Sequence, residues 1–262
     1  MTVSAVALDG LDEIAPGADL PAALASALER QGPAPPGAGG GQFVLTDSDV
    51  IVIAHKIVSK AEGRIRALSD VAVTERAAAL ARELDKDARH VQVVLDESSA
   101  VLRASRGILI CVTHHGFVCA NAGVDASNVP GGDTVVLLPL DPDDSARTLR
   151  RRLRELTGVA PAVIITDSFG RPWRHGQVDV AIGCAGLSPL EDWRGRTDAQ
   201  GRELKATWIA IADELAAAAD LARTKDGRRP VVLIRGAHRH VTAEDGPGVA
   251  AIIRPESEDL FR

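Results

Sequence analysis

Short apolar runs rich in Val and Ile alternate along this chain with segments whose apolar side chains recur at three- and four-residue steps. The first pattern predicts β-strands, because β-branched side chains favour extended backbone. Such runs occupy residues 4–8, 50–54, 90–95, 108–113, 134–138, 162–165 and 231–234.

The second pattern predicts helices. Its two clearest sets are Ala146, Leu149, Leu153 and Leu156, and Leu204, Trp208, Ile211, Leu215 and Ala218. Asp144 is placed to cap the start of the first of these helices and Gly158 to end it, since acidic side chains and glycine favour these two positions. We also predict a helix over residues 74–86 and a first helix ahead of residue 31.

Together these elements predict an α+β protein with mixed β-sheets and flanking helices. Residues 32–42 are almost entirely Gly, Pro and Ala, a composition that predicts a surface loop between the first helix and a strand. No repeat and no second linker divides the chain. We therefore expect residues 1–262 to form a single catalytic unit, in one body or in two interleaved lobes.

Charge and composition exclude several classes of protein. A formal net charge of −6 and only seven aromatic residues argue against nucleic-acid binding, which needs a basic surface or rings for stacking. No apolar run approaches the ~18 residues of a membrane span, and the N-terminus lacks a secretory pattern, so we expect a cytoplasmic protein without membrane contact. Cys111, Cys119 and Cys184 form no CxxC motif and are expected to be reduced, buried side chains.

Three patterns that suggest familiar chemistry have simpler explanations. Residues 246–251 match GxGxxA, but too few residues follow to complete a dinucleotide-binding unit. His238 and His240 have no third metal ligand near them in the sequence, so surface positions explain them. The arginine-rich residues 147–154 are flanked by acidic residues, which is typical of a solvated helix face.

Two segments carry more specific chemistry. One sets Asp125 and Asn128 three positions apart among small residues, directly after a predicted strand. The other places Asp167 and Ser168 at the carboxyl end of the predicted strand 162–165, ahead of a loop rich in Gly and Arg. Ligands of α/β proteins collect at such strand ends, so the two segments are candidates for a common site.

Carboxylates that reach one point from different strands repel each other unless a cation lies between them. Asp125 and Asp167 would therefore suit Mg²⁺ or Mn²⁺, which prefer oxygen ligands and complete their shell with phosphates. Residues 55–64 add Lys60, a flexible ammonium that can reach a phosphate. Taken singly, each of these residues is also explained as a turn, cap or solvated surface residue.

With these residues in view, the chain resembles the coenzyme F420-0:L-glutamate ligase family, the γ-glutamyl ligases that finish the deazaflavin cofactor F420. The most specific matches are residues 58–64, 121–129 and 166–187, and the similarity extends from residue 10 to residue 261. The resemblance implies an α+β fold with mixed sheets, found as an intertwined homodimer.

The resemblance also implies roles for individual residues. The residues assigned to the GTP site are Leu11, Asp12, Glu13, Ile14, His55, Lys60 and Asn128. Asp125 and Asp167 correspond to ligands of Mg²⁺ or Mn²⁺, two ions per site, with K⁺ as a further candidate ion. Ser168 stands where the family usually has a Thr beside the second metal. Lys60, Asp125 and Asp167 are thus the expected catalytic residues.

Three features depart from the family's pattern. His55 replaces a Ser or Thr of the GTP site, and Lys225 falls where many relatives offer a Gln or Glu to the second metal. The loop at residues 32–42 is longer than is usual in the family.

The implied substrates are GTP, L-glutamate and the precursor F420-0. GTP phosphorylates the terminal carboxylate of the precursor, and the amine of glutamate attacks the acyl phosphate, while Arg171 or Arg174 is placed to hold an anionic substrate arm. Two alternatives stay open. The carboxylates would equally serve a metal-dependent phosphotransferase or an amide ligase with another acceptor, and the departures at His55 and Lys225 would suit a non-catalytic nucleotide-binding subunit.

Overall fold

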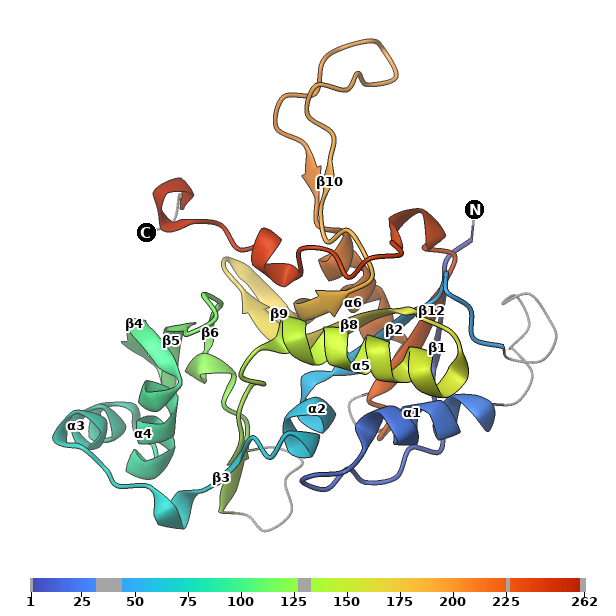
Figure 1. The fold of residues 1–262 in the computed structure, drawn as a ribbon. Helices are drawn as coiled ribbons and strands as arrows, with labels where there is room; N and C mark the ends of the chain where they lie inside the picture. Colours follow the sequence, from blue (N-terminus) through green and yellow to red (C-terminus); the bar gives the residue numbers. More distant parts are fainter. Residues whose placement is uncertain (1, 32–43, 127–132, 225–226, 260–262) are drawn as a thin grey trace.

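The computed structural model describes residues 2–31, 44–126, 133–224 and 227–259. Its largest sheet has five strands in the order β1-β12-β2-β8-β9 (Figure 1). Their bounds are β1 Ser4–Ala7, β2 Val50–Ala54, β8 Ala162–Arg171, β9 Arg174–Ala185 and β12 Val231–Arg235. Strands β2 and β8 are parallel and the other neighbouring pairs are antiparallel, so the sheet is mixed, as predicted.

Three smaller sheets accompany it in the described residues. They consist of β4 Ser98–Ser105, β5 Ile108–Thr113 and β6 Val118–Ala120; of β3 Ile65–Ala67 with β7 Thr134–Val136; and of β10 Glu191–Asp192 with β11 Trp208–Ile209. Strands β10 and β11 are the base of an arm, residues 191–209, that projects from the rest of the chain in Figure 1.

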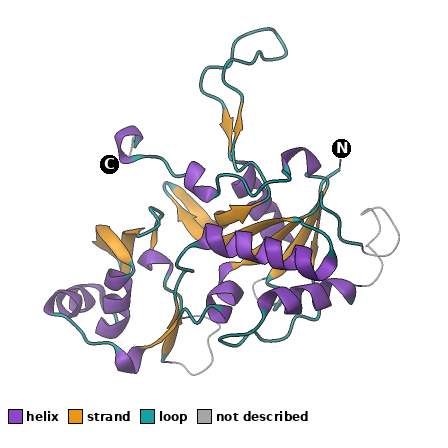
Figure 2. Ribbon diagram, viewed as in Figure 1, coloured by secondary structure: helices purple, strands orange, loops and turns teal. Residues whose placement is uncertain are grey.

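Helices cover both faces of the large sheet (Figure 2). The described helices are α1 Leu20–Glu29, α2 His55–Ala61, α3 Glu75–Leu84, α4 Ala88–Asp96, α5 Pro142–Thr157 and α6 Ile211–Ala222. Of these, α3 and α4 pack against the small sheet of β4 and β5 and not against the large one. Short 3-10 turns lie at Leu68–Asp70, Asn121–Gly123, His238–His240, Val249–Ala251 and Glu256–Glu258. In the view of Figure 1, α5 lies in front of the sheet and α6 lies behind it. This arrangement confirms the mixed sheets with flanking helices.

Two hydrophobic cores hold these layers together. The larger one surrounds the central strands, where every residue from Val50 to Ile53 and from Ala162 to Ile165 is fully buried. Burial of consecutive residues, rather than of alternate ones, is expected for strands covered on both faces. The smaller core joins α3 and α4 to β5 through residues such as Val91 and Leu109.

Two predicted elements are wrong. Residues 90–95 form part of helix α4, which begins after the N-cap Asp87 and buries Val91 and Val94 on one face, so a helical period was hidden in an apolar run. The helix predicted from Leu204 begins only at Ile211, because the preceding residues pair across the arm, where Trp208 lies in β11.

Two details of predicted elements also differ. The N-cap of α5 is Asp141, whose Oδ1 accepts from the amide of Asp144 at 2.9 Å, whereas Gly158 ends the helix as predicted. The arginine-rich face of α5 is not wholly solvated. Arg150 is 8% exposed, and it donates to Asp245 and to backbone carbonyls, including that of Thr242.

Several expectations concern single features. The three cysteines are free and buried, as predicted. No helix in the described part of the chain combines the length and apolar character needed to cross a bilayer. The loop at residues 32–42 lies outside the described residues.

Candidate active site

The first pair of site residues is brought together by parallel strand pairing. Ala54 at the end of β2 is the register partner of Thr166 in β8, so the next residues along, His55 and Asp167, meet. His55 Nε2 lies 3.3 Å from Asp167 Oδ1, and the histidine side chain is only 2% exposed. Asp167 Oδ1 also accepts from the amide of Ser168 at 2.8 Å. The carboxylate is thereby held at the N-terminal end of α2.

Asp125 reaches the same turn of α2 from a different segment. It follows the 3-10 turn Asn121–Gly123 and exchanges two backbone hydrogen bonds with Val136 of β7. Its Oδ2 lies 2.6 Å from Lys56 Nζ. Since His55 and Lys56 are neighbours, Asp125 and Asp167 both converge on the first turn of α2.

Strand β8 does not end where the sequence pattern predicted. It continues through Asp167 and Ser168 to Arg171 and turns into β9, with Trp173 at φ 58 in the turn. Side chains alternate along a strand, so Asp167 and Ser168 point to opposite faces. Ser168 is on the face covered by α6, because its hydroxyl bonds Asp179, the partner of Arg223 at the end of α6.

On that face lies a buried ion pair that sequence reasoning missed. Asp179, the cross-strand partner of Ser168, accepts from Ser168 Oγ at 2.6 Å, from Thr166 Oγ1 at 3.0 Å and from Arg223 Nη2 at 2.6 Å. Arg223 follows the last residue of α6, and its side chain is 8% exposed. The pairing of Asp179 with Ser168 depends on the register of the β8–β9 hairpin, which the sequence pattern does not give.

The expected nucleotide residues also meet. Lys60 on α2 is 8% exposed as a residue, and its Nζ donates to Glu13 Oε1 at 2.8 Å. This hydrogen bond with the ammonium lowers the pKa of Glu13. In the same segment Ile14 is buried in the larger core, while Asp12 is exposed. The structure thus brings the segment 11–14 beside Lys60, the arrangement a shared phosphate site requires.

The donor atoms near α2 suit a hard divalent cation. Asp125 and Asp167 supply carboxylate oxygens from separate segments, and each contacts a basic side chain where a metal would otherwise offset its charge. Among the residues that the structure describes, no three or more His, Cys, Asp or Glu side chains are grouped to hold a metal. Two carboxylates are nevertheless sufficient for Mg²⁺, which completes its shell with water and substrate phosphates.

Comparison with known proteins identifies the family. Residues 10–236 match the family described as F420-0:Gamma-glutamyl ligase. The coenzyme F420:L-glutamate ligase of Methanothermobacter thermautotrophicus is 43% identical over 263 residues, with 100% of both chains covered. This chain belongs to the F420-0:gamma-glutamyl ligase family. It is therefore a ligase of coenzyme F420 biosynthesis, which confirms the resemblance seen in the sequence.

Other members of the F420-0:gamma-glutamyl ligase family are equally similar. The coenzyme F420:L-glutamate ligase of Methanopyrus kandleri is 49% identical over 220 residues, which cover 83% of this chain and 87% of the relative. That of Archaeoglobus fulgidus is 41% identical over 263 residues, covering 100% and 97%. The match spans essentially the full length of these ligases.

The structure does not bring every predicted residue into the ligase site. Asn128 and Lys225 lie outside the described residues. The contact of Asn128 with GTP and the loss of a second-metal ligand at Lys225 therefore stay predictions. Arg171 and Arg174 lie in the exposed turn of the β8–β9 hairpin, where Arg171 Nη2 donates to the carbonyl of His175.

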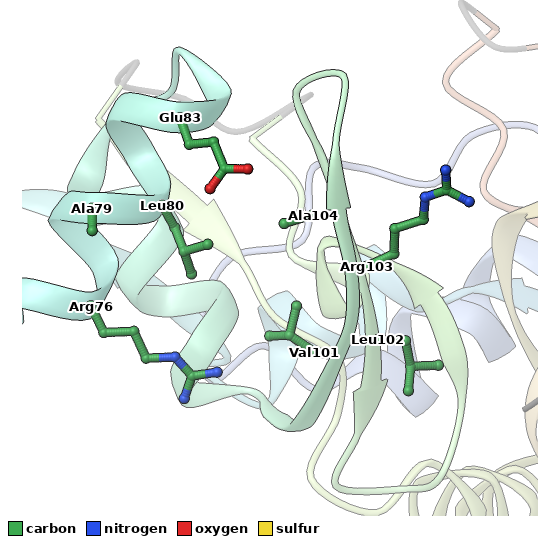
Figure 3. Close-up of a pocket in the computed structure, with 8 residues that line it drawn as sticks. All are labelled: Arg76, Ala79, Leu80, Glu83, Val101, Leu102, Arg103 and Ala104. Atoms are coloured by element: carbon green, nitrogen blue, oxygen red, sulfur yellow. The ribbon is translucent and has the colours of Figure 1, made fainter.

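A cavity away from these residues lies elsewhere in the ligase. Figure 3 shows it between α3 and β4, with Leu80 and Val101 facing each other and Arg76 and Glu83 on the helix. Its volume is about 420 Å³, and no predicted site residue lines it. A second cavity, of about 340 Å³, lies at the start of α5 and includes Phe117.

Proposed function

We propose that this ligase adds γ-linked L-glutamate to F420-0, with GTP as the energy source and an acyl phosphate as the intermediate. The observation that carries the proposal is the convergence of Asp125 and Asp167 on the first turn of α2, one turn from Lys60. A carboxylate is a poor electrophile, and phosphorylation by GTP would give it a leaving group. The description of the matching family, F420-0:Gamma-glutamyl ligase, supports this acceptor.

Asp125 and Asp167 are the side chains we assign to Mg²⁺ or Mn²⁺, with K⁺ as a further candidate. Ser168, which the resemblance places beside a second ion, donates to Asp179 on the opposite face of β8, so its assignment to that ion stays a prediction. When bound, such ions neutralise charge on the transferring phosphoryl group. The residues of the chain then have separable tasks. Lys60 binds a phosphate, while His55 and Lys56 hold the carboxylates in place through the contacts described above.

The nucleotide would lie over the segment 11–14, with Leu11, Asp12, Glu13 and Ile14 forming its wall and Asn128 touching it as well. The Lys60 ammonium already faces this segment, where it contacts Glu13. His55 was also assigned to this site, but its buried ring faces Asp167, so its contact with the nucleotide stays a prediction.

The test is to incubate the purified protein with F420-0, GTP, Mg²⁺ and L-glutamate and to identify the products by mass spectrometry. The precursor should gain glutamyl units, and GTP should yield GDP and phosphate only when F420-0 is present. Hydroxylamine in place of glutamate should trap the acyl phosphate as a hydroxamate. Release of GMP and pyrophosphate would indicate nucleotidyl transfer and overturn the proposal.

Variants of the two carboxylates make the same test specific. Asp125→Asn and Asp167→Asn should each lower turnover by on the order of 10² or more, because each removes charge from the phosphoryl-transfer site. Asp85→Asn, at an exposed position after α3, is the matched control and should retain activity. Near-normal turnover by both site variants would exclude them from catalysis.

We further propose that the ligase acts as a homodimer. The arm of residues 191–209 projects from the rest of the chain and carries Trp208, which is 49% exposed and lies beneath the Arg194 guanidinium at 4.1 Å. A projecting segment with an exposed aromatic ring is suited to contact with a second copy.

A further inference from the structure

The second cavity, at the start of α5, lies close to the proposed reaction centre. Ile182 lines it from the bulge in β9, where Ile165 pairs with Gly183 and Thr166 with Ala181. Phe117, another lining residue, makes an edge contact with Phe169, their ring centroids 6.2 Å apart.

Phe169 lies two residues after Asp167 and therefore on the same face of β8. The lining residue Phe117 thus contacts the face of the sheet that carries the Asp167 carboxylate. Its volume of about 340 Å³ falls within the range of about 300–1,000 Å³ that is typical of small-molecule sites.

Arg147 supplies a cation to this cavity. Its side chain is half-buried, and it makes no hydrogen bond or ion pair with any residue that the structure describes. Arg150, one turn further along α5, shows the contrast, because its guanidinium is occupied by Asp245 and by backbone carbonyls. A half-buried guanidinium without a partner is suited to bind a carboxylate from a ligand.

His115 supplies a hydrogen-bond acceptor. Its Nε2 lies 2.9 Å from the carbonyl oxygen of Pro139 and 3.0 Å from that of Leu140, so Nε2 must carry the proton. Its Nδ1 is then an acceptor, and this atom is buried without a partner among the described residues. A buried acceptor of this kind calls for a donor such as an amino group.

The acidic side chains of the cavity exclude a purely anionic ligand. Asp143 is committed to structure, since its carboxylate accepts from the amides of Cys184 and Val249, both at 2.8 Å. Asp141 is exposed and keeps one carboxylate oxygen beyond the cap that it gives to Asp144. Cation and acceptors in one cavity match a ligand that carries both a carboxylate and an amine.

We propose that this cavity binds the acceptor amino acid, L-glutamate, with Arg147 on a carboxylate and with His115 and Asp141 toward the amine. The inference rests on the proposed function and assigns the amine substrate a place separate from the nucleotide. It also makes Arg147 a specificity residue, because a nucleophile without a carboxylate cannot form an ion pair with its guanidinium.

The test compares two nucleophiles in Arg147→Gln. The KM for L-glutamate should rise at least tenfold, as expected for loss of a charge-assisted bond. The KM values for GTP and F420-0 should stay within about twofold. Hydroxamate formation from hydroxylamine, which lacks a carboxylate, should be unchanged. Arg151→Gln, on the exposed side of the same helix, is the matched control, and Arg147→Lys should recover part of the loss.

Two results would overturn the assignment. One is an unchanged KM for glutamate in an active Arg147→Gln enzyme, and the other is an equal loss with hydroxylamine, which would place F420-0 in the cavity instead. Calorimetric titration of L-glutamate into the wild type and into Arg147→Gln gives a second readout that needs no turnover. A wild type that binds glutamate through Arg147 but forms no product would contradict the proposed function alone.

Discussion

At the scale of single residues, Lys60 has the surroundings that bear most directly on nucleotide use. Its stem is buried on α2, and its ammonium rests on the exposed Glu13. Lys60→Ala should raise the KM for GTP by about tenfold and lower kcat, with little change in the KM for glutamate. Steady-state kinetics with each substrate in turn measure this, with Lys205→Ala in the arm as control. Equal effects on both substrates would return Lys60 to a structural role.

Asp179 and Arg223 form a buried ion pair, so we expect the stability effects of replacing the two residues to be coupled. Both side chains are more than nine-tenths buried, and burial lowers the pKa of the arginine. Asp179→Asn should cost about 3–5 kcal/mol of unfolding free energy, because it leaves a buried guanidinium without a counter-charge. Urea denaturation measures the loss. In the double variant with Arg223→Gln the loss should be smaller than the sum of the single losses, and strict additivity would argue against the pairing.

Asp213 predicts a pH dependence of stability. Burial raises its pKa above the ordinary 3.8, although Oδ1 accepts from the Ala181 amide at 2.9 Å. The folded state therefore holds this proton more tightly than the unfolded state, so stability falls as pH rises from about 3.8 through the raised pKa and is level above it. Asp213→Asn removes that fall, and its advantage over the wild type should grow from pH 4 to pH 7.

Urea denaturation at several pH values checks this expectation. Glu214→Gln, at the exposed neighbouring position, is the control and should show no such trend. A constant difference in unfolding free energy between Asp213→Asn and the wild type across this range would mean that burial does not raise the pKa of this carboxyl.

At the scale of elements, the start of α5 is seated on β9 where there is no room for a side chain. A Cβ built at Gly183 would overlap the carbonyl of Pro142, whereas one built at Gly170, in the same hairpin, meets nothing within 4 Å. Gly183→Ala should therefore cost about 1–3 kcal/mol by displacing α5, while Gly170→Ala should stay within about 0.5 kcal/mol. Thermal unfolding measures the stability of both variants. Equal stabilities would show that α5 can shift away from β9 without loss of unfolding free energy.

The elements also show how far the sequence pattern could be followed. Central strands such as β2 were predictable because their residues are apolar without interruption and both faces are covered. Helix α4 was not, since Val91, Val93 and Val94 suit a strand until the cap at Asp87 is recognised. Strand β8 was predicted too short, because its polar half is stabilised by pairing with β9 and not by apolar residues.

The candidate site divides in the same way. Asp125, Asp167 and Lys60 could be selected from the sequence because each follows a recognisable strand. Their partners could not, since Glu13 and Lys60 are 47 positions apart and Arg223 and Asp179 are 44 apart. Such contacts depend on strand order and register, which a single sequence does not reveal.

At the scale of the whole molecule, the proposed homodimer predicts a mass. Light scattering at micromolar concentration should give about twice the 27.5 kDa of one chain. Replacing the arm residues 194–206 with a short Gly-containing turn should shift the mass toward the monomer, because it removes the projecting segment but leaves both cores intact. A wild type that is monomeric at this concentration, or an armless variant that stays dimeric, would exclude the arm as the interface.

The burial of the three thiols has a practical consequence for labelling the protein. Burial raises the pKa of Cys119 and of Cys184 to about 12, and it raises that of Cys111 too. Because the thiolate is the reactive form, a maleimide dye at pH 7 should leave all three native cysteines untouched. A cysteine introduced at Gln200, in the exposed arm, would then take up a single fluorophore per chain without removal of any native thiol.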